Sequence, residues 1–139
     1  MKTLLISGGT GGIGSALSIK FIEKGYKVFT THNNKSEDFL NNWLIQNNIS
    51  KKNIQFINCD IRDEKNTKIA LEQVLKNNNI DVLINNAGIT KDSSFLKMTS
   101  EQWNDVINTN LISIFNFTQS VAKQMVDSKF GNIINISSI

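Results

Sequence analysis

Ser7-Gly8-Gly9-Thr10-Gly11-Gly12-Ile13-Gly14 is the segment from which the fold of this chain can be predicted. It separates the apolar run Leu4-Leu5-Ile6 from a helical pattern that begins near Gly12. Glycine permits a tight turn and a close approach of the backbone to a ligand. The helix that follows directs free N–H groups and the positive end of its dipole at that ligand. This order of strand, turn and helix predicts a site for the phosphates of a nucleotide.

The glycines of this segment fit more than one dinucleotide-binding spacing. Gly9, Gly11 and Gly14 fit the ordinary fingerprint. Gly8, Gly12 and Gly14 fit a version with a three-residue gap, and Gly8, Gly11 and Gly14 fit an evenly spaced version. The turn alone therefore does not choose among families of dinucleotide-binding proteins. A plain tight turn between a strand and a helix is the alternative.

Strand and helix patterns alternate along the whole chain. We expect helices from Gly12 to about Lys24, after the cap Ser36, after Asp63, and from the capping box Thr99/Gln102 to Val126. The pattern predicts an α/β, Rossmann-type, doubly wound parallel sheet with flanking helices, as one domain over residues 1–139. The expected strands are residues 4–7, 26–31, 54–58, 82–84 and 133–136. The expected inward stripe of the last helix is Trp103, Val106, Ile107, Leu111, Ile114, Phe115, Val121, Ala122, Met125 and Val126.

The composition argues against several classes of partner. The net charge is +3 without a block of like charges, so nucleic acid is not an expected partner. No run approaches the roughly 20 apolar residues that span a bilayer, and the apolar start is too short for a signal peptide. The single cysteine, Cys59, favours a reducing compartment and is interpreted as a small apolar filler. We therefore expect a cytoplasmic protein without a membrane partner, and no metal site.

The end of the second strand bears on the choice of cofactor. NAD sites usually carry Asp or Glu there to hold the ribose 2′-hydroxyl. Here the residues are Thr30-Thr31-His32-Asn33-Asn34-Lys35, and no acid appears before Glu37. Nothing in this segment repels a 2′-phosphate, and His32 and Lys35 are candidates to attract one. The sequence therefore favours NADP(H), with solvated loop residues as the alternative reading of His32 and Lys35.

A second motif, Asn85-Asn86-Ala87-Gly88, closes the fourth expected strand, which should lie beside the first at the point where ligands bind. Together with Ser7–Gly14, it resembles the short-chain dehydrogenase/reductase family, whose turn motif TGxxxGxG is present here with Ser7 in place of Thr. The resemblance covers the whole chain. Within the family, the segments Gly88–Asp92, Lys97–Thr99 and Thr109–Leu111 are most similar to the acetoacetyl-CoA reductases, and the carrier-protein 3-oxoacyl reductases are similar as well.

The resemblance implies roles for individual residues. Asp60 and Ile61 would border the adenine, and Asp92 would lie near the substrate unless it is only a turn residue. Residues that would hold the pyrophosphate are Gly8, Thr10, Gly11, Gly12, Ile13 and Gly14. Residues that would line the ribose and nicotinamide are Asn86, Ala87, Gly88, Ile89 and Thr90.

Two further residues would belong to the catalytic apparatus. Asn110 lies on the expected apolar stripe, so its amide must find partners. The resemblance implies that it holds a water in a proton relay, and the alternative is a structural amide bound to a backbone carbonyl. Ser138 matches the family's catalytic serine, which hydrogen-bonds the substrate carbonyl, and we expect it at the end of the fifth strand.

The family places a tyrosine and, four residues later, a lysine after the catalytic serine, whereas here only Ile139 follows Ser138. The single tyrosine, Tyr26, begins the second strand and cannot replace the proton donor. We therefore expect the N-terminal part of an NADPH-dependent reductase that converts acetoacetyl-CoA, an acyl-CoA thioester, to the (R)-3-hydroxyacyl thioester. We expect this chain to lack the C-terminal part of the fold and to be inactive alone. We expect the complete enzyme to be a homotetramer. The alternatives are a 3-oxoacyl-[acyl-carrier-protein] reductase and a truncated domain that binds NADP(H) without catalysis.

Overall fold

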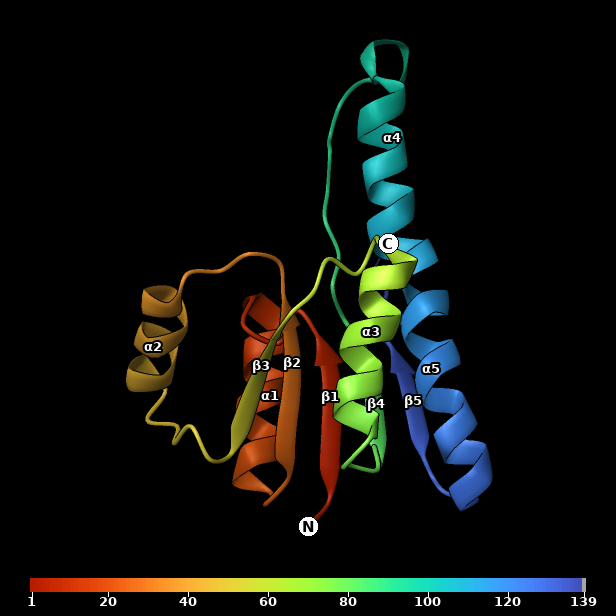
Figure 1. Ribbon diagram of the computed structural model, residues 1–139. Coiled ribbons are helices and arrows are strands. Elements are labelled where there is room, and N and C mark those ends of the chain that lie inside the picture. The colour runs from red at the N-terminus through yellow and green to blue at the C-terminus, as the bar shows by residue number, and fades with distance from the viewer. Residues whose placement is uncertain (139) are drawn as a thin grey trace.

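The computed structural model describes residues 1–138 and contains one parallel sheet in the order β3-β2-β1-β4-β5 (Figure 1). The chain builds the sheet outward from β1 to β3 and then returns to the other side of β1 with β4. The prediction of a Rossmann-type, doubly wound sheet is therefore confirmed. The strands are β1 (Thr3–Ser7), β2 (Lys27–His32), β3 (Ile54–Asn58), β4 (Val82–Asn85) and β5 (Asn132–Asn135).

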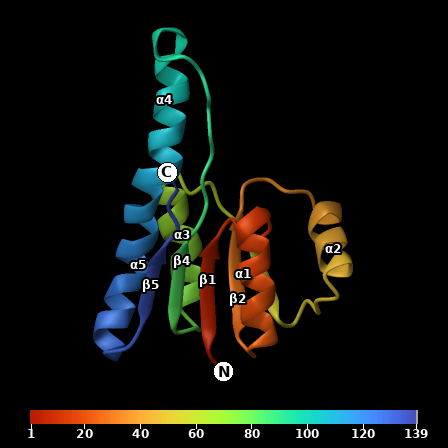
Figure 2. The same cartoon turned by 180° about the vertical axis from the view of Figure 1, so that it is seen from behind.

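Helices cover both faces of the sheet. In Figure 1, α3 and α5 lie in front of the strands, and the view from behind in Figure 2 shows α1 on the opposite face. Both views show α4 extending beyond the carboxyl ends of the strands. The helices are α1 (Gly12–Glu23), α2 (Glu37–Gln46), α3 (Glu64–Leu75), α4 (Ser100–Ile107) and α5 (Ser113–Ser128), with a short 3₁₀ turn, η1 (Phe95–Lys97), and a π turn, η2 (Asn108–Ile112).

Adjacent residues of the strands supply two separate cores because strand side chains alternate between the faces of a sheet. Leu5 packs in a buried cluster with Leu71 of α3 and Phe117 of α5. Leu4, on the opposite face, packs in a second cluster with Trp43 and Leu44 of α2. This arrangement explains why the short strand runs are apolar throughout instead of alternating with polar residues.

The predicted helix starts are confirmed by their capping hydrogen bonds. The Ser36 hydroxyl accepts from the Phe39 N–H, and the Asp63 carboxylate accepts from the Asn66 N–H. Thr99 and Gln102 form the reciprocal capping box at the start of α4. These caps satisfy N–H groups that a helix leaves without internal partners.

The prediction for the long final helix is wrong in two respects. It is not one regular helix, because η2 separates α4 from α5. Each inserted residue turns a helix by about 100°, so the π turn changes which face of α5 meets the sheet. Four residues of the predicted inward stripe are exposed, namely Trp103 of α4, Leu111 of η2, and Phe115 and Val126 of α5. The buried residues of α5 are Ser113, Asn116, Phe117, Val121 and Met125, of which only Val121 and Met125 were expected.

The fifth strand forms one edge of the sheet. Ile133 and Ile134 are 41% and 42% exposed, and β5 ends at Asn135. Ser138 therefore lies beyond the strand and not at its last residue, as the sequence had suggested. Within the described part of the chain, no helix is both long and apolar enough to span a bilayer.

Candidate cofactor-binding site

The glycine turn after β1 is held by contacts that only glycine permits at three positions. Gly8 has φ +67°, in the left-handed region that favours glycine. The Gly9 N–H donates to Thr30 Oγ1 at 2.8 Å, and a Cβ at Gly9 would collide with that oxygen. A Cβ at Gly14 would collide with the backbone oxygen of Gly8. These three glycines fix the shape of the turn.

Gly11 and Gly12 are needed for a different reason. A Cβ on Gly12 would meet no protein atom within 4 Å, and one on Gly11 would meet only the Gly8 carbonyl oxygen, at 3.7 Å. Both residues line a cleft, so their missing side chains leave room for a ligand.

The cleft has a volume of about 610 Å³ and lies at the carboxyl ends of the strands. It brings together the predicted phosphate, adenine and nicotinamide segments, which come from different parts of the chain. Thr90, Asp92, Asn110 and Ser138 are not among its lining residues. The lining consists of Gly8, Thr10, Gly11, Gly12, Ile13, Gly14, Thr31, His32, Asn33, Lys35, Cys59, Asp60, Ile61, Arg62, Asn86, Ala87, Gly88, Ile89, Thr109 and Ile136.

The start of α1 is suited to an anion. Its N-cap, Gly11, forms no side-chain capping bond, and the first turn contains no acidic residue. The first N–H groups of a helix have no internal partners, and the helix dipole favours a negative charge there. The residues present therefore fit the pyrophosphate of a dinucleotide at the open side of Gly11 and Gly12.

The carboxyl ends of β1 and β4 are joined by Ser7. Its buried hydroxyl accepts from the backbone N–H groups of Asn86 and Ala87, each at 3.0 Å. The Asn86 side chain donates a further bond, from Nδ2 to the Ser7 carbonyl oxygen, at 3.0 Å. Asn85 Nδ2 similarly donates to Asn135 Oδ1 of β5 at 2.8 Å. Asparagine amides thus tie neighbouring strands together at this edge of the sheet.

The end of β2 carries less positive charge than the sequence suggested. Burial, with a smaller contribution from nearby Lys35, lowers the pKa of His32, so the imidazole is neutral at pH 7. Its Nδ1 accepts from the Lys35 N–H at 3.2 Å, which assigns the proton of the neutral ring to Nε2. Lys35 lines the cleft, and its Nζ lies 4.7 Å from the centre of the Phe39 ring. Lys35 is thus the cation at this wall.

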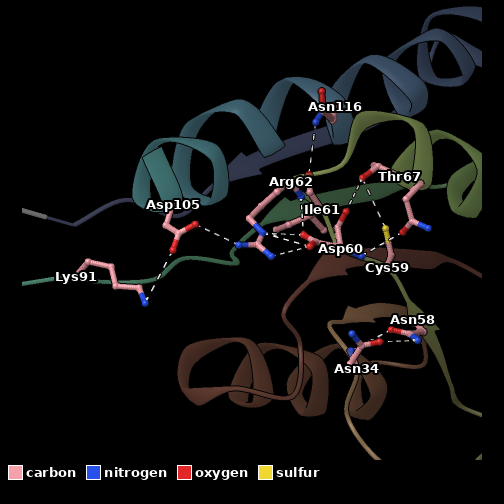
Figure 3. Close-up of polar contacts among 11 residues, drawn as sticks. Asn34, Asn58, Cys59, Asp60, Ile61, Arg62, Thr67, Lys91, Asp105 and Asn116 are labelled. Atoms are coloured by element: carbon pink, nitrogen blue, oxygen red, sulfur yellow. Dashed lines mark hydrogen bonds and ion pairs between the residues drawn. The ribbon is translucent and has the colours of Figure 1, made fainter. Parts of the chain in front are cut away.

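The end of β3 forms the opposite wall. Asp60 forms a two-pronged ion pair with Arg62, and Arg62 reaches Asp105 of α4 (Figure 3). Hydrogen bonds from Arg62 are the main cause of a lowered pKa at Asp60. Cys59 is buried in the core beside Thr67, and this burial raises the pKa of its thiol. The interpretation of Cys59 as a small filler is confirmed.

Asn110 does not occupy the buried position that the sequence suggested, because η2 leaves it exposed. Its amide nevertheless pairs with both backbone groups of Ile89. Asn110 Nδ2 donates to the Ile89 carbonyl oxygen, and Asn110 Oδ1 accepts from the Ile89 N–H, each at 2.9 Å. This is the structural alternative, and it anchors the segment that follows β4. A part in a proton relay stays a prediction.

The remaining predicted residues lie around the mouth of the cleft. Thr90 and Asp92 are exposed in the segment between β4 and η1, and Ser138 follows β5 at the carboxyl edge of the sheet. Sequence reasoning missed the roles of Thr30 and Arg62 at the ends of β2 and β3. Their signal was a polar residue within a few positions of the carboxyl end of a strand, since β2 ends at His32 and β3 at Asn58 and the sites of such sheets lie there.

Comparisons with known proteins agree with this geometry. The sequence profile of the short chain dehydrogenase family matches residues 2–139. An acetoacetyl-CoA reductase of Acinetobacter sp. (strain RA3849) is 37% identical over 139 residues, which are 99% of this chain and 56% of that protein. Another, of Shinella zoogloeoides, is 41% identical over 138 residues, or 99% of this chain and 55% of that protein. A 3-oxoacyl-[acyl-carrier-protein] reductase of Staphylococcus aureus (strain Mu50 / ATCC 700699) is 33% identical over 141 residues, or 99% of this chain and 56% of that protein. The chain spans about half the length of these curated relatives.

A solved structure supports the same relationship. The crystal structure of a variant of actinorhodin polyketide ketoreductase with NADPH superimposes with a TM-score of 0.87 at 28% sequence identity. The match covers 99% of this chain and 53% of that one. The glycine turn, the Asn85–Gly88 segment and the match over residues 2–139 lead to one conclusion. This chain belongs to the short-chain dehydrogenase/reductase family.

Proposed function

We propose that this chain is the cofactor-binding part of a cytoplasmic reductase that uses NADPH to convert acetoacetyl-CoA to the (R)-3-hydroxyacyl thioester. The observation that carries the proposal is the space beside Gly11 and Gly12. These residues form the start of α1, which has no side-chain cap, and they line the cleft. The relatives named acetoacetyl-CoA reductase support the substrate class, since they are 37% and 41% identical to this chain.

NADPH, when bound, would supply the hydride that reduces the ketone. Thr10, Ile13 and Gly14 would hold the pyrophosphate together with Gly8, Gly11 and Gly12, which the turn geometry already supports. The segment Asn86–Ile89 would lie along the ribose and nicotinamide, with Thr90 at its exposed end. Lys35 would attract the 2′-phosphate, because it is the cation at the end of β2 and no acid is near in the sequence before Glu37.

Ser138 and Asp92 would act on the substrate side. Ser138 would donate a hydrogen bond to the ketone oxygen, and Asp92 would lie near the thioester. Tyr26 is not suited to deliver the proton that the new alkoxide needs. Its ring packs against Phe21 with the centroids 4.9 Å apart, next to the amino end of β2. A proton donor of the family's Tyr-x-x-x-Lys type is accordingly proposed in sequence beyond residue 139.

A titration of the 139-residue chain with NADPH tests cofactor binding. Trp43 is the useful donor for energy transfer to the reduced nicotinamide because it lies against α1, the helix that begins at the proposed phosphate site. Its indole N–H donates to Ser15 of α1 at 2.8 Å. Trp103 is 53% exposed on α4 and can be replaced by Phe to leave Trp43 alone. We expect saturable transfer with NADPH and at least about tenfold weaker binding of NADH, equivalent to about 1.4 kcal/mol. Absence of saturable binding to a folded chain would refute the proposal.

The substrate is tested separately with a chimeric enzyme. Residues 1–139 are joined to the C-terminal remainder of the Acinetobacter reductase, and NADPH oxidation is followed with acetoacetyl-CoA and with acetoacetyl-carrier protein. The account predicts a higher kcat/KM for the CoA thioester. A preference for the carrier protein would favour the 3-oxoacyl-[acyl-carrier-protein] reductase, which the 33% identical Staphylococcus protein supports as second candidate. Sequencing beyond codon 139 tests for the Tyr-x-x-x-Lys motif, whose absence would favour a domain that binds NADP(H) without catalysis.

The outer face of the final helices supports assembly into a homotetramer. Trp103, Leu111 and Phe115 are each more than half exposed there. Large exposed apolar side chains are frequent at subunit contacts. Light scattering on the complete enzyme checks this, and a monomeric mass would contradict it.

A further inference from the structure

Two asparagine side chains join the loop that follows β2 to the end of β3 (Figure 3). The Asn34 N–H donates to Asn58 Oδ1 at 3.0 Å, and Asn58 Nδ2 donates to Asn34 Oδ1 at 3.2 Å. The two residues are 24 positions apart in sequence. Asn58 is the last residue of β3 and lies opposite His32, the last residue of β2. The asparagine pair therefore continues the contact between these two strands into the loop.

The pair holds an unusual backbone conformation in place. Asn34 has φ +51°, in the left-handed region that asparagine tolerates better than most residues with a side chain. Asn33 and Lys35, on either side of it, line the cleft, whereas the Asn34 side chain is bonded to β3. Both hydrogen bonds of the pair act at Asn34. They therefore fix the turn that brings its two neighbours to the cleft.

Lys35 is restrained by further contacts of the same loop. Its N–H donates to His32 Nδ1 at 3.2 Å, and its Nζ lies 4.7 Å from the centre of the Phe39 ring on α2. The loop is thus attached to β2 and α2 through Lys35 itself, and to β3 through the asparagine pair. Neither Asn34 nor Asn58 is among the described residues that line the cleft, so a substitution there leaves the walls of the cleft intact.

A cation that is already in position contributes more to phosphate binding than a mobile one. Lysine carries a point charge on a flexible stem, so its own structure does not fix where the charge lies. Ordering a side chain and its loop costs free energy when a ligand binds, and a loop that is ordered beforehand avoids part of this cost. The attraction between two charges also falls with the distance between them. The anchoring of this loop therefore bears on the 2′-phosphate, which NADPH has and NADH lacks.

We propose that Asn34 and Asn58 are positioning residues that hold Lys35 at the cleft and thereby make the site selective for NADPH over NADH. The proposal rests on the proposed binding of NADPH, with Lys35 as the cation that attracts the 2′-phosphate. Asn34 and Asn58 act through Lys35 and not by touching the cofactor. Their substitution should therefore lower the affinity for NADPH and leave the affinity for NADH unchanged.

The test compares the dissociation constants of NADPH and NADH, measured by Trp43 fluorescence on the 139-residue chain. Asn58→Ala removes both bonds of the pair, and we expect it to reduce the roughly tenfold preference for NADPH by a factor of about three. Asn34→Gly keeps the left-handed turn and the N–H donor but removes the acceptor of Asn58 Nδ2, so its effect should be smaller. Gln55→Ala is the matched control, because Gln55 is an exposed amide side chain on the same strand, and it should keep the full preference.

A double-mutant cycle tests whether the pair acts through Lys35. Lys35→Met removes the ammonium group but keeps a long side chain, and we expect it to abolish the preference for NADPH. Adding Asn58→Ala to Lys35→Met should then cause no further change in the preference, because residues that act as a unit have non-additive effects. A purely structural role of Asn58 would instead weaken the binding of both cofactors alike, with or without Lys35.

The possible failures are distinguishable. If the unmodified chain binds neither cofactor, the proposed function itself fails. If it prefers NADPH and Asn58→Ala leaves the ratio of the two dissociation constants unchanged, the positioning role is refuted. If Asn58→Ala lowers this ratio equally in the presence and in the absence of Lys35, the pair acts on another group, and the proposal is again wrong.

Discussion

Asn86 donates two hydrogen bonds to Ser7 that hold the carboxyl ends of β1 and β4 together: its N–H donates to Ser7 Oγ, and its Nδ2 donates to the Ser7 carbonyl oxygen, each at 3.0 Å. The two strands flank the point at which the order of the sheet reverses. A site at such a point is assembled from both halves of the sheet, so its geometry depends on this contact.

Ser7→Ala should destabilise the chain by about 1–3 kcal/mol, because it leaves the half-buried N–H groups of Asn86 and Ala87 without their acceptor. Urea unfolding measures the change. Ser7→Thr keeps the hydroxyl and is the matched control, with a stability close to that of the unmodified chain. Equal destabilisation by both substitutions would mean that packing, and not the hydrogen bonds, makes Ser7 necessary.

Gly14→Ala should lower the stability of the fold, whereas Gly12→Ala should weaken NADPH binding. A Cβ at Gly14 would collide with the Gly8 carbonyl and lie 2.5 Å from Asn86 Nδ2, at a cost of about 1–3 kcal/mol in stability. A Cβ at Gly12 enters open space, so the stability should change by less than about 1 kcal/mol. NADPH binding should nevertheless weaken in Gly12→Ala, roughly tenfold.

Unfolding and fluorescence titrations separate these two effects. Ala16→Val, on the exposed side of α1, controls for added bulk on the same helix. Unchanged NADPH affinity in Gly12→Ala would contradict the placement of the phosphates at the open side of the turn.

The stability should depend on pH through His32. Because the pKa of His32 is lowered in the folded chain, the unfolded chain binds more protons as the pH falls through about 6.5. The fold therefore loses stability from this pH down through the lowered pKa of the folded state. His32→Asn keeps a side-chain acceptor for the Lys35 N–H but does not titrate. Urea midpoints between about pH 8 and pH 5 should fall less steeply in His32→Asn, and equal slopes would show that His32 is not responsible.

Asn110→Ala should free the segment that follows β4. The substitution removes both hydrogen bonds to Ile89, and we expect a loss of about 1 kcal/mol in stability. Hydrogen exchange should accelerate at the Ile89 N–H while the amides of β1 remain protected. Asn104→Ala, on the exposed surface of α4, serves as the control. If the Ile89 N–H stays fully protected in Asn110→Ala, Asn110 does not anchor this segment.

Local patterns were sufficient to predict most of the fold. The caps Ser36 and Asp63 lie where short polar side chains precede an apolar repeat, and such signals act within one turn of helix. The place of the fourth strand beside the first followed from the doubly wound pattern of alternating strands and helices. The glycine turn itself was predicted for the same reason, because strand, turn and helix are contiguous in sequence, whereas three glycine spacings stayed open.

The errors arose where the outcome depends on contacts that are distant in sequence. Trp103 and Phe115 fit a regular 3.6-residue repeat, but both are exposed, Trp103 on α4 beyond the sheet and Phe115 after the π turn at Asn108–Ile112 that breaks the repeat. The ion pair between Arg62 and Asp105 joins residues 43 positions apart. No local pattern specifies it, because only the packed sheet brings the end of β3 close to α4.

Backbone amide NMR of the chain during titration with NADPH tests the central claim most directly. The account predicts saturable shifts at Gly8–Gly14, at Asp60–Arg62 and at Asn86–Ile89, which line one cleft from three separate segments. Amides at the amino ends of the strands, such as that of Tyr26, should not move. Shifts confined to residues outside the cleft, or none at saturating NADPH in a folded chain, would contradict the assignment.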